Sequence, residues 1–535
     1  MYSLDYRRLW LIIIALVIIL AFAFQGSRGL WEPDEGRYVR CAYEMLKSGD
    51  WLTPRLNGNP HFTKPPLAYW LIASGLSLFG MNEWGARFFH GVAFVLTALM
   101  AGYLATHMWD QRVGLLSVLV YSTMVFTSVA ANIATTDMIL TLFVTGAMLS
   151  CWMSVSQPQA SSPLKVVWGL LMWLFLGLAF LTKGPPGLLP LLVGITYLSF
   201  SRRASRPPSL TIITGIIIFS VVALPWYVLV IQKYSGLLPY FIRDEIIGRI
   251  VTGEHTRNSG LFGAFKIYPH TLLLGSLPWS FFLLTWMWKT KQRIFAVQWW
   301  KQLRARDNAL FILLWFLVPL VFFTISSSRL PLYVIPLFVP LALATARCIV
   351  LYYPLKASAL LQMRGKPAVL VLLLIFSLIG SRAIAAHYGP KRDSRVIWEK
   401  MSVIIKDRIG DAPYELSVIG LQHDGITFYS GKMVTTLDIE DGKGHSFSAK
   451  MNVFQKMDEL SSQPGIHVFL LSQKNLEKIT GAFTKKGIRY VIADGPFDYK
   501  LIFCQRTDSE NAGTGTVPIQ NSTSSMKSAA IVPGH

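Results

Sequence analysis

The chain has 535 residues, of which 53% are hydrophobic and only 15% are charged, and its mean hydropathy is +0.44. Soluble globular domains carry about 25% charged residues, so this composition excludes an ordinary soluble protein and indicates a polytopic membrane protein. The net charge of +21 could indicate nucleic-acid binding. The positions of the basic residues, described below, favour a membrane topology signal instead.

Apolar runs of about 20 residues predict transmembrane helices. We expect spans at about 10–24, 87–106, 113–130, 133–152, 166–181, 184–200, 209–231, 271–288, 309–325, 331–350 and 367–385. The apolar run 67–80 has only about 14 residues, so we expect it to be re-entrant or interfacial.

Basic residues gather in alternate loops of this topology. With the N-terminus inside, the inner segments are rich in Lys and Arg and hold only three acids, Asp5, Asp110 and Asp307. This is the positive-inside pattern of a multi-pass protein of the cytoplasmic (inner) membrane. It accounts for much of the net charge, so we expect no nucleic-acid partner.

The composition changes near residue 387, where the apolar runs shorten and turn residues appear. Short β-like runs alternate there with helical patterns, at 416–420, 467–471 and 489–492. We therefore expect three parts: a transmembrane domain over 1–386, a small periplasmic α/β domain over 387–506, and a disordered Ser/Thr/Gly-rich tail over 507–535.

Polar clusters stand at the predicted outer ends of the spans, where ionisable groups usually serve function. They are WEPDEGRYVR at 31–40, HFTKPPLAYW at 61–70, ANIATTDM at 131–138, the loop 243–260 and SSSRLPLY at 326–333. Each has a structural explanation of its own, such as solvated ion pairs, a snorkelling lysine or a first-turn acid. Together they supply what sugar transfer from a lipid phosphate needs: an acid to orient or deprotonate the acceptor, and cations to neutralise the leaving phosphate.

The order of motifs resembles a known family. The acidic pair Asp34–Glu35 is followed by KPPL at 64–67, TDM at 136–138, KGP at 183–185, PWY at 225–227, LPW at 277–279 and SRLPLYVIP at 328–336. This order, over about residues 1–350, is similar to the bacterial branch of the protein mannosyltransferase superfamily, and most closely to the lipid A aminoarabinose transferases.

The resemblance implies a mainly α, GT-C-type helical bundle with about 11–13 transmembrane helices. It also implies an undecaprenyl-phosphate (polyprenyl-phosphate) sugar donor and a periplasmic acceptor such as lipid A or another glycolipid. By this resemblance the chain is a glycosyltransferase that moves a hexosyl or pentosyl group.

Site residues follow from the same resemblance, position by position. Asp34 and Asp137 correspond to the catalytic acids. The expected phosphate and donor ligands are Arg37, Lys64, Tyr333, Arg329 and Arg249. Further candidates in the matched segments are Glu35, Glu245, His255 and Tyr268.

One departure concerns a metal. The family commonly has an acid directly before KPP, where this chain has Thr63, and that acid can help to hold a divalent ion. His61 and His255 are then the remaining candidate metal ligands.

Two other functions stay open. A transporter or flippase would place ionisable groups at mid-membrane and show two similar halves, and the sequence has neither feature. A non-catalytic protein that only binds a lipid-linked sugar would keep the same cavity, and the missing acid at Thr63 leaves this possibility open.

Overall fold

The computed structural model describes residues 5–155, 162–202, 204–252, 258, 260, 262–294, 307–361, 365–387, 391–439, 451–460 and 465–506. These residues form two compact units. The helical unit comprises the described residues up to 387 except 30–36, and the α/β unit comprises 30–36 together with 391–506. The domain boundary expected from the sequence places 30–36 in the transmembrane domain instead.

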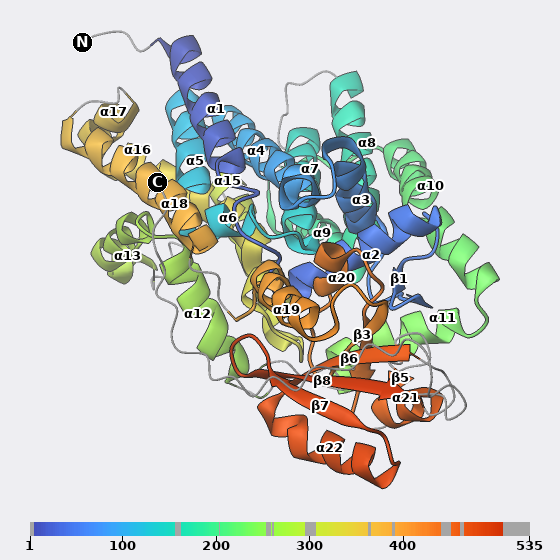
Figure 1. The fold of residues 1–535 in the computed structure, drawn as a ribbon. Coiled ribbons are helices and arrows are strands. Elements are labelled where there is room, and N and C mark those ends of the chain that lie inside the picture. The colour runs from blue at the N-terminus through green and yellow to red at the C-terminus, as the bar shows by residue number, and fades with distance from the viewer. Residues whose placement is uncertain are drawn as a thin grey trace. The chain divides into compact units, whose positions relative to one another are not determined.

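Figure 1 shows the helices of the first unit. In chain order they are α1 (Tyr6–Phe22), α2 (Asp34–Ser48), α3 (Leu67–Phe79), α4 (Glu83–Met108), α5 (Gln111–Thr123), α6 (Val125–Ala130), α7 (Thr136–Val155), α8 (Ser162–Lys183), η1 (Pro185–Leu188), α9 (Leu189–Phe200), α10 (Ser209–Lys233), α11 (Leu237–Pro239), η2 (Tyr240–Thr252), α12 (Gly263–Gly275), α13 (Ser280–Ile294), α15 (Asp307–Ile325), η3 (Pro331–Leu337), α16 (Phe338–Tyr352), α17 (Pro354–Leu361) and α18 (Gly365–His387). A hairpin of β1 (Arg55–Leu56) and β2 (Asn59–Pro60) precedes α3. The first three residues of α2 belong to the α/β unit.

Seven helices among the described residues are long and apolar enough to cross a membrane, or eight if one bent pair counts as a span. They are Glu83–Met108, Thr136–Val155, Pro163–Lys183, Ser209–Lys233, Asp307–Ile325, Pro331–Tyr352 and Ala368–Ala385. The helix α3 has 13 residues and is shorter than a crossing needs, as expected from the sequence.

Two expected spans are not continuous helices. The run 271–288 is divided between α12 and α13, which meet at an angle of 106°, and Pro278 in the break cannot donate a helix hydrogen bond. The run 113–130 is interrupted at Met124, whose backbone is extended. The hydroxyl of Thr127 donates to the carbonyl of Tyr121 and takes the place of a backbone donor at this break.

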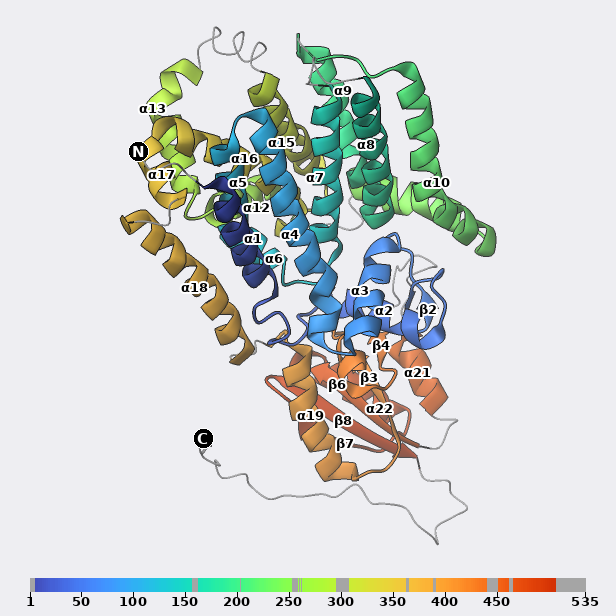
Figure 2. The same cartoon turned by 90° about the horizontal axis from the view of Figure 1, so that it is seen from above.

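The helix α7 lies inside the helical bundle, packed between α4 and α8 (Figure 2). It is apolar on all sides, and 89% of its spanning segment is buried. The close approach of α8 depends on Gly146, because a Cβ at this position would lie 2.8 Å from the ring of Phe175. The helix α7 also contacts η1 and η3.

The α/β unit is built on a six-stranded sheet in the order β5-β4-β3-β6-β8-β7. The strands β5, β4, β3 and β6 are parallel, whereas β8 pairs antiparallel with β6 and β7. The elements are α19 (Ser394–Ile409), β3 (Tyr414–Ile419), α20 (Ile426–Ser430), β4 (Thr435–Asp438), β5 (Met451–Asn452), α21 (Val453–Leu460), β6 (Gly465–Ser472), η4 (Gln473–Asn475), α22 (Leu476–Lys485), β7 (Tyr490–Asp494) and β8 (Tyr499–Arg506).

Both faces of this sheet are covered, because alternate residues of each strand point to opposite sides. Val418 and Leu470 pack with α19 and α20, whereas Ile419 and Leu471 pack with α21 and α22 (Figure 1). The expected α/β character is therefore confirmed. The expected tail 507–535 lies outside the described residues.

Candidate active site

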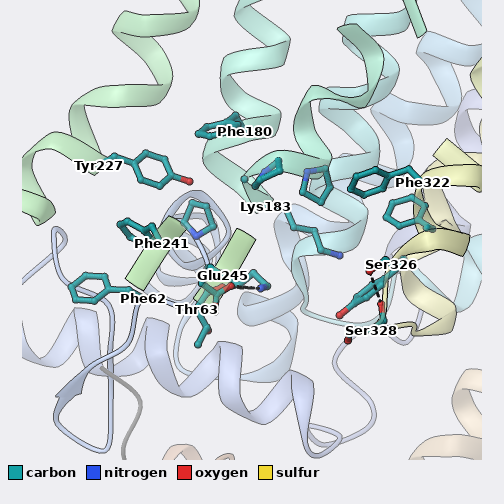
Figure 3. Close-up of a pocket in the computed structure, with 17 residues that line it drawn as sticks. Phe62, Thr63, Phe180, Lys183, Tyr227, Phe241, Glu245, Phe322, Ser326 and Ser328 are labelled. Atoms are coloured by element: carbon teal, nitrogen blue, oxygen red, sulfur yellow. Dashed lines mark hydrogen bonds and ion pairs between the residues drawn. The ribbon is translucent and has the colours of Figure 1, made fainter. Parts of the chain in front are cut away.

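A pocket in the helical unit collects residues from several of the sequence motifs (Figure 3). It encloses about 940 Å³, including the space open to solvent at its mouth. Its polar side chains include Lys64, Lys183, Glu245 and Tyr333. Most of the remaining wall is apolar and is formed by Phe62, Pro65, Phe180, Pro185, Pro186, Tyr227, Phe241, Phe322 and Phe323.

Lys64 and Glu245 face each other across one part of this pocket. Lys64 directly precedes Pro65 and Pro66, which lead into α3, while Glu245 lies on η2. The Lys64 Nζ atom is 3.7 Å from the Glu245 carboxylate, and the two side chains are 14% and 13% exposed. Tyr240 donates a hydrogen bond of 3.2 Å to Glu245, and so holds the carboxylate next to the ammonium.

A second ion pair joins Lys183, at the last residue of α8, to Asp137, in the first turn of α7. A cation at a helix C-terminus and an acid at a helix N-terminus both complement the helix dipole. The hydroxyl of Thr135 donates to the other Asp137 oxygen at 3.2 Å. The Lys183 ammonium also lies 4.1 Å from the centroid of the Tyr333 ring, in a cation–π arrangement.

Gly184 explains why the KGP motif turns immediately after Lys183. Its φ of 71° and ψ of −136° belong to a region open to glycine only. A Cβ would meet no atom closer than 3.8 Å, so backbone conformation and not space requires the glycine. The turn ends α8 at Lys183 and lets Pro185 begin η1.

Arg329 and Tyr268 form hydrogen bonds to backbone carbonyl groups and do not line the pocket. The Arg329 guanidinium donates to the carbonyl oxygens of Asn258, Gly260 and Thr324, each at 3.0 Å, and the residue is buried. The buried Tyr268 hydroxyl donates to the carbonyl of Phe323 at 3.4 Å. Neither residue is among those that line the pocket in the described part of the chain.

The acids of the first motif lie at the start of α2. Asp34 and Glu35 are its first two residues and belong to the α/β unit. Glu35 is buried and accepts a hydrogen bond of 2.9 Å from the Trp31 amide. Arg37, in the helical unit, has its guanidinium 5.5 Å from the Tyr38 ring centroid.

Two further candidates, Arg249 and His255, lie in or next to η2 in the sequence. The backbone of Arg249 is part of η2, but its side chain is outside the described structure, as is the whole of His255.

The described residues contain no preformed site for the metal ion considered from the sequence. No group of three or more His, Cys, Asp or Glu side chains that could hold an ion occurs in that part of the chain. The His61 ring is buried and its Nε2 atom is hydrogen-bonded to the Thr63 hydroxyl at 2.7 Å. Among the described side chains, the residues around His61 and Thr63 therefore do not form a metal site.

Sequence reasoning missed Lys183 as a site residue. The motif KGP carried part of the family resemblance, but a lysine at the end of an apolar run also fits a snorkelling side chain. The contact with Asp137 is what distinguishes it, and that contact joins residues 46 positions apart.

Comparison with known proteins agrees with this arrangement. Residues 8–241 match the family model of the dolichyl-phosphate-mannose-protein mannosyltransferases. An undecaprenyl phosphate-α-4-amino-4-deoxy-L-arabinose arabinosyl transferase of Pseudomonas fluorescens Pf0-1 is 29% identical over 63% of this chain, and one of Proteus mirabilis is 29% identical over 70%. A third, from Pseudomonas fluorescens Pf-5, is 32% identical over 70% of the chain. The chain spans 57%, 67% and 64% of these three relatives.

Solved structures show the same fold. The crystal structure of ArnT from Cupriavidus metallidurans bound to undecaprenyl phosphate aligns with a TM-score of 0.73 at 20% identity, over 92% of this chain and 97% of that one. The oligosaccharyltransferase of Archaeoglobus fulgidus aligns with a TM-score of 0.53 at 14% identity, over 91% of this chain and 69% of that one. The expected GT-C-type helical fold is thus confirmed. The chain is thus similar to the protein mannosyltransferases over residues 8–241 and to aminoarabinose transferases over about two thirds of its length, and it has the fold of the ArnT structure.

Proposed function

We propose that this protein transfers a sugar from undecaprenyl phosphate to an acceptor on the periplasmic side of the inner membrane, with lipid A as the first candidate acceptor. The names of the matched relatives support both the donor and the aminoarabinose class of sugar. The observation that carries the proposal is the pocket that combines two lysines with a wall of aromatic and proline side chains.

Such a lining suits an amphipathic ligand. A polyprenyl-phosphate sugar has an anionic phosphate next to a long apolar chain, and ammonium groups are point-charge partners for phosphate oxygens. Lys64 and Lys183 supply the two cations, while Phe322 and Phe323 belong to the apolar wall. A soluble sugar nucleotide has no long apolar chain that could pack against this apolar wall.

In the reaction, the bond between the sugar C1 and the phosphate oxygen breaks as an acceptor oxygen bonds to C1. Undecaprenyl phosphate leaves with the electron pair, and the lysines neutralise its growing negative charge. A hydroxyl acceptor must lose its proton to an acid residue acting as a base, whereas a phosphate acceptor is already anionic and needs only orientation.

We assign to Asp34 the role of orienting or deprotonating the acceptor. This assignment rests on the position of Asp34 in its sequence motif. Arg37 and Tyr333 complete the proposed donor set on the same basis. Asp137 acts by holding Lys183, and Glu245 by holding Lys64. Each cation is therefore kept in place by an acid that an incoming phosphate can replace as its partner.

The test uses the purified full-length protein with labelled undecaprenyl-phosphate aminoarabinose and lipid A. We expect transfer by the wild type and by Glu399→Gln, an exposed control on α19, and little transfer by Asp34→Asn or Lys64→Ala. Near-normal transfer by both active-site variants would reject the assignment.

The same assay separates the other functions. A flippase would move the labelled lipid between leaflets of a vesicle without forming a sugar–acceptor bond, which mass spectrometry of the acceptor detects. A binding protein would retain undecaprenyl phosphate but yield no product in either measurement.

A further inference from the structure

The segment that carries Asp34 is part of the α/β unit, although it lies more than 350 residues before the rest of that unit in the sequence. The Glu32 amide donates to the carbonyl of Arg392 at 2.8 Å, and the Ser394 amide donates to the carbonyl of Leu30 at 2.9 Å. These two bonds form an antiparallel bridge between Trp31 and Asp393.

Glu32 is the centre of this attachment. One of its carboxylate oxygens, Oε1, accepts hydrogen bonds from the Ser394 hydroxyl and from the Gly425 amide, the latter at 2.6 Å. The residue is only 5% exposed, and Ser394 is fully buried. A third attachment comes from Tyr429, whose hydroxyl accepts from the Leu30 amide at 2.8 Å.

The fit around this carboxylate leaves no spare room. A Cβ on Gly36 would overlap the Glu32 carboxylate, and one on Gly425 would lie 2.8 Å from its Oε1 atom and 2.7 Å from the Ser394 hydroxyl. Glycine at these two positions lets the backbone close around the side chain. Both the backbone and the Glu32 side chain of segment 30–36 are therefore bonded to the rest of the α/β unit.

We propose that the C-terminal α/β domain is a clamp that fixes the Asp34 segment for catalysis, with Glu32 as the positioning residue. This rests on the proposed function, because it gives Asp34 the acceptor-facing role. Glu32 acts through Asp34, which lies two residues further along the chain. The domain thereby contributes to the turnover rate and not to the binding of the donor phosphate.

Two substitutions at Glu32 distinguish positioning from general damage. Glu32→Gln keeps an oxygen that can accept both hydrogen bonds, and its amide nitrogen replaces Oε2, which has no hydrogen-bond partner among the described residues. Glu32→Ala removes both bonds and leaves the buried Ser394 hydroxyl and Gly425 amide without their acceptor. Glu399→Ala, on the exposed side of α19, is the matched control.

The experiment measures kcat and KM for the labelled lipid donor with the full-length protein. A misplacement of about 1 Å can cost ~10²-fold in rate, so we expect Glu32→Ala to lower kcat on the order of 10²-fold with little change in KM. Glu32→Gln and Glu399→Ala should stay close to wild type. In an Asp34→Asn background, Glu32→Ala should add no further loss, because it acts through the residue already removed.

A normal kcat for Glu32→Ala, an equal loss in the Asp34→Asn background, or a lost affinity for undecaprenyl phosphate would each overturn the clamp. If Glu32→Ala does not accumulate, Tyr429→Phe replaces it, since it removes one attachment and keeps the ring. Amide hydrogen exchange provides an activity-independent measurement: exchange at residues 30–32 should be faster in Glu32→Ala than in Glu399→Ala. If the wild type transfers no sugar but the two variants still differ in exchange, the proposed function is rejected while the attachment of segment 30–36 through Glu32 is retained.

Discussion

Lys183 and Asp137 form an ion pair in which each side chain is only 8% exposed. The pair joins the end of α8 to the start of α7 and places an ammonium on the wall of the pocket. A buried pair of this kind contributes little net stability while it is intact, but it is costly to break from one side only. The two residues should therefore behave as a unit.

Replacing Lys183 by Ala should destabilise the protein by roughly 3–5 kcal/mol, since it leaves the Asp137 carboxylate buried without its cation. Lys183→Ala/Asp137→Asn should recover much of that stability but should not recover transfer, because the phosphate ligand is still missing. Thermal unfolding in detergent and the transfer assay measure the two quantities. Lys366→Ala, an exposed residue of α18, is the control. Recovery of transfer by the double variant would contradict a phosphate-binding role for Lys183.

Removing the acid beside Lys64 should strengthen the binding of undecaprenyl phosphate. Glu245 is 3.7 Å from the Lys64 ammonium and competes with a phosphate for it, so Glu245→Gln leaves more positive potential in the pocket. We expect an affinity increase of at least about threefold, against a decrease for Lys64→Ala. Equilibrium binding of the lipid to the purified protein measures both. Weaker binding by Glu245→Gln would show that the acid is needed to position the lysine.

Arg329 should prove structural. Its guanidinium holds three backbone carbonyl groups, a geometry that the single ammonium of lysine cannot reproduce. Arg329→Lys should lower the free energy of unfolding by about 1–3 kcal/mol and leave the affinity for undecaprenyl phosphate unchanged. The exposed Arg206→Lys should change neither quantity. A selective loss of lipid binding would instead restore Arg329 to the donor ligands expected from the sequence.

Glu32 should make the stability of the protein depend on pH. Burial, and then the nearby Asp424, raise the pKa of the Glu32 carboxyl well above its usual 4.5, while Ser394 and Gly425 oppose the shift and Glu35 adds to it. The folded state therefore keeps a proton that the unfolded state releases, and the free energy of unfolding falls as pH rises above about 4.5. His423 contributes a pH dependence of the opposite sign, because burial lowers its pKa to about 4 and the folded state releases a proton that the unfolded state keeps.

The difference between wild type and Glu32→Gln isolates the first effect, because the His423 contribution is common to both proteins. We expect the unfolding midpoint of Glu32→Gln, relative to wild type, to be higher at pH 8 than at pH 4.5. Midpoints measured across this range in one detergent give the comparison. A difference that does not vary with pH would mean that Glu32 has the same pKa in the folded and unfolded states.

The class of the protein and several of its candidate site residues could be predicted from the amino-acid sequence alone. Long apolar runs can be buried as helices in a bilayer, and the short, nearly continuous apolar runs after residue 387 are typical of strands that are covered on both faces. The residues Lys64, Asp137 and Tyr333 could be singled out because charged or polar groups at helix ends need a reason to be there. The break at Met124 was not predictable, because the side-chain bond that compensates for it comes from Thr127 in the next helix.

Contacts between residues far apart in the sequence became visible in the folded protein alone. Lys183 is singled out by its ion pair with Asp137. Glu32 is singled out by its hydrogen bonds with Ser394 and Gly425. No local sequence pattern predicts these contacts. Arg329 donates to three backbone carbonyl groups that its motif does not reveal, and these contacts lead us to expect a structural role for it. Hydropathy and spacing report what each residue can do, whereas the partner of a buried charge is chosen by the packing of distant segments.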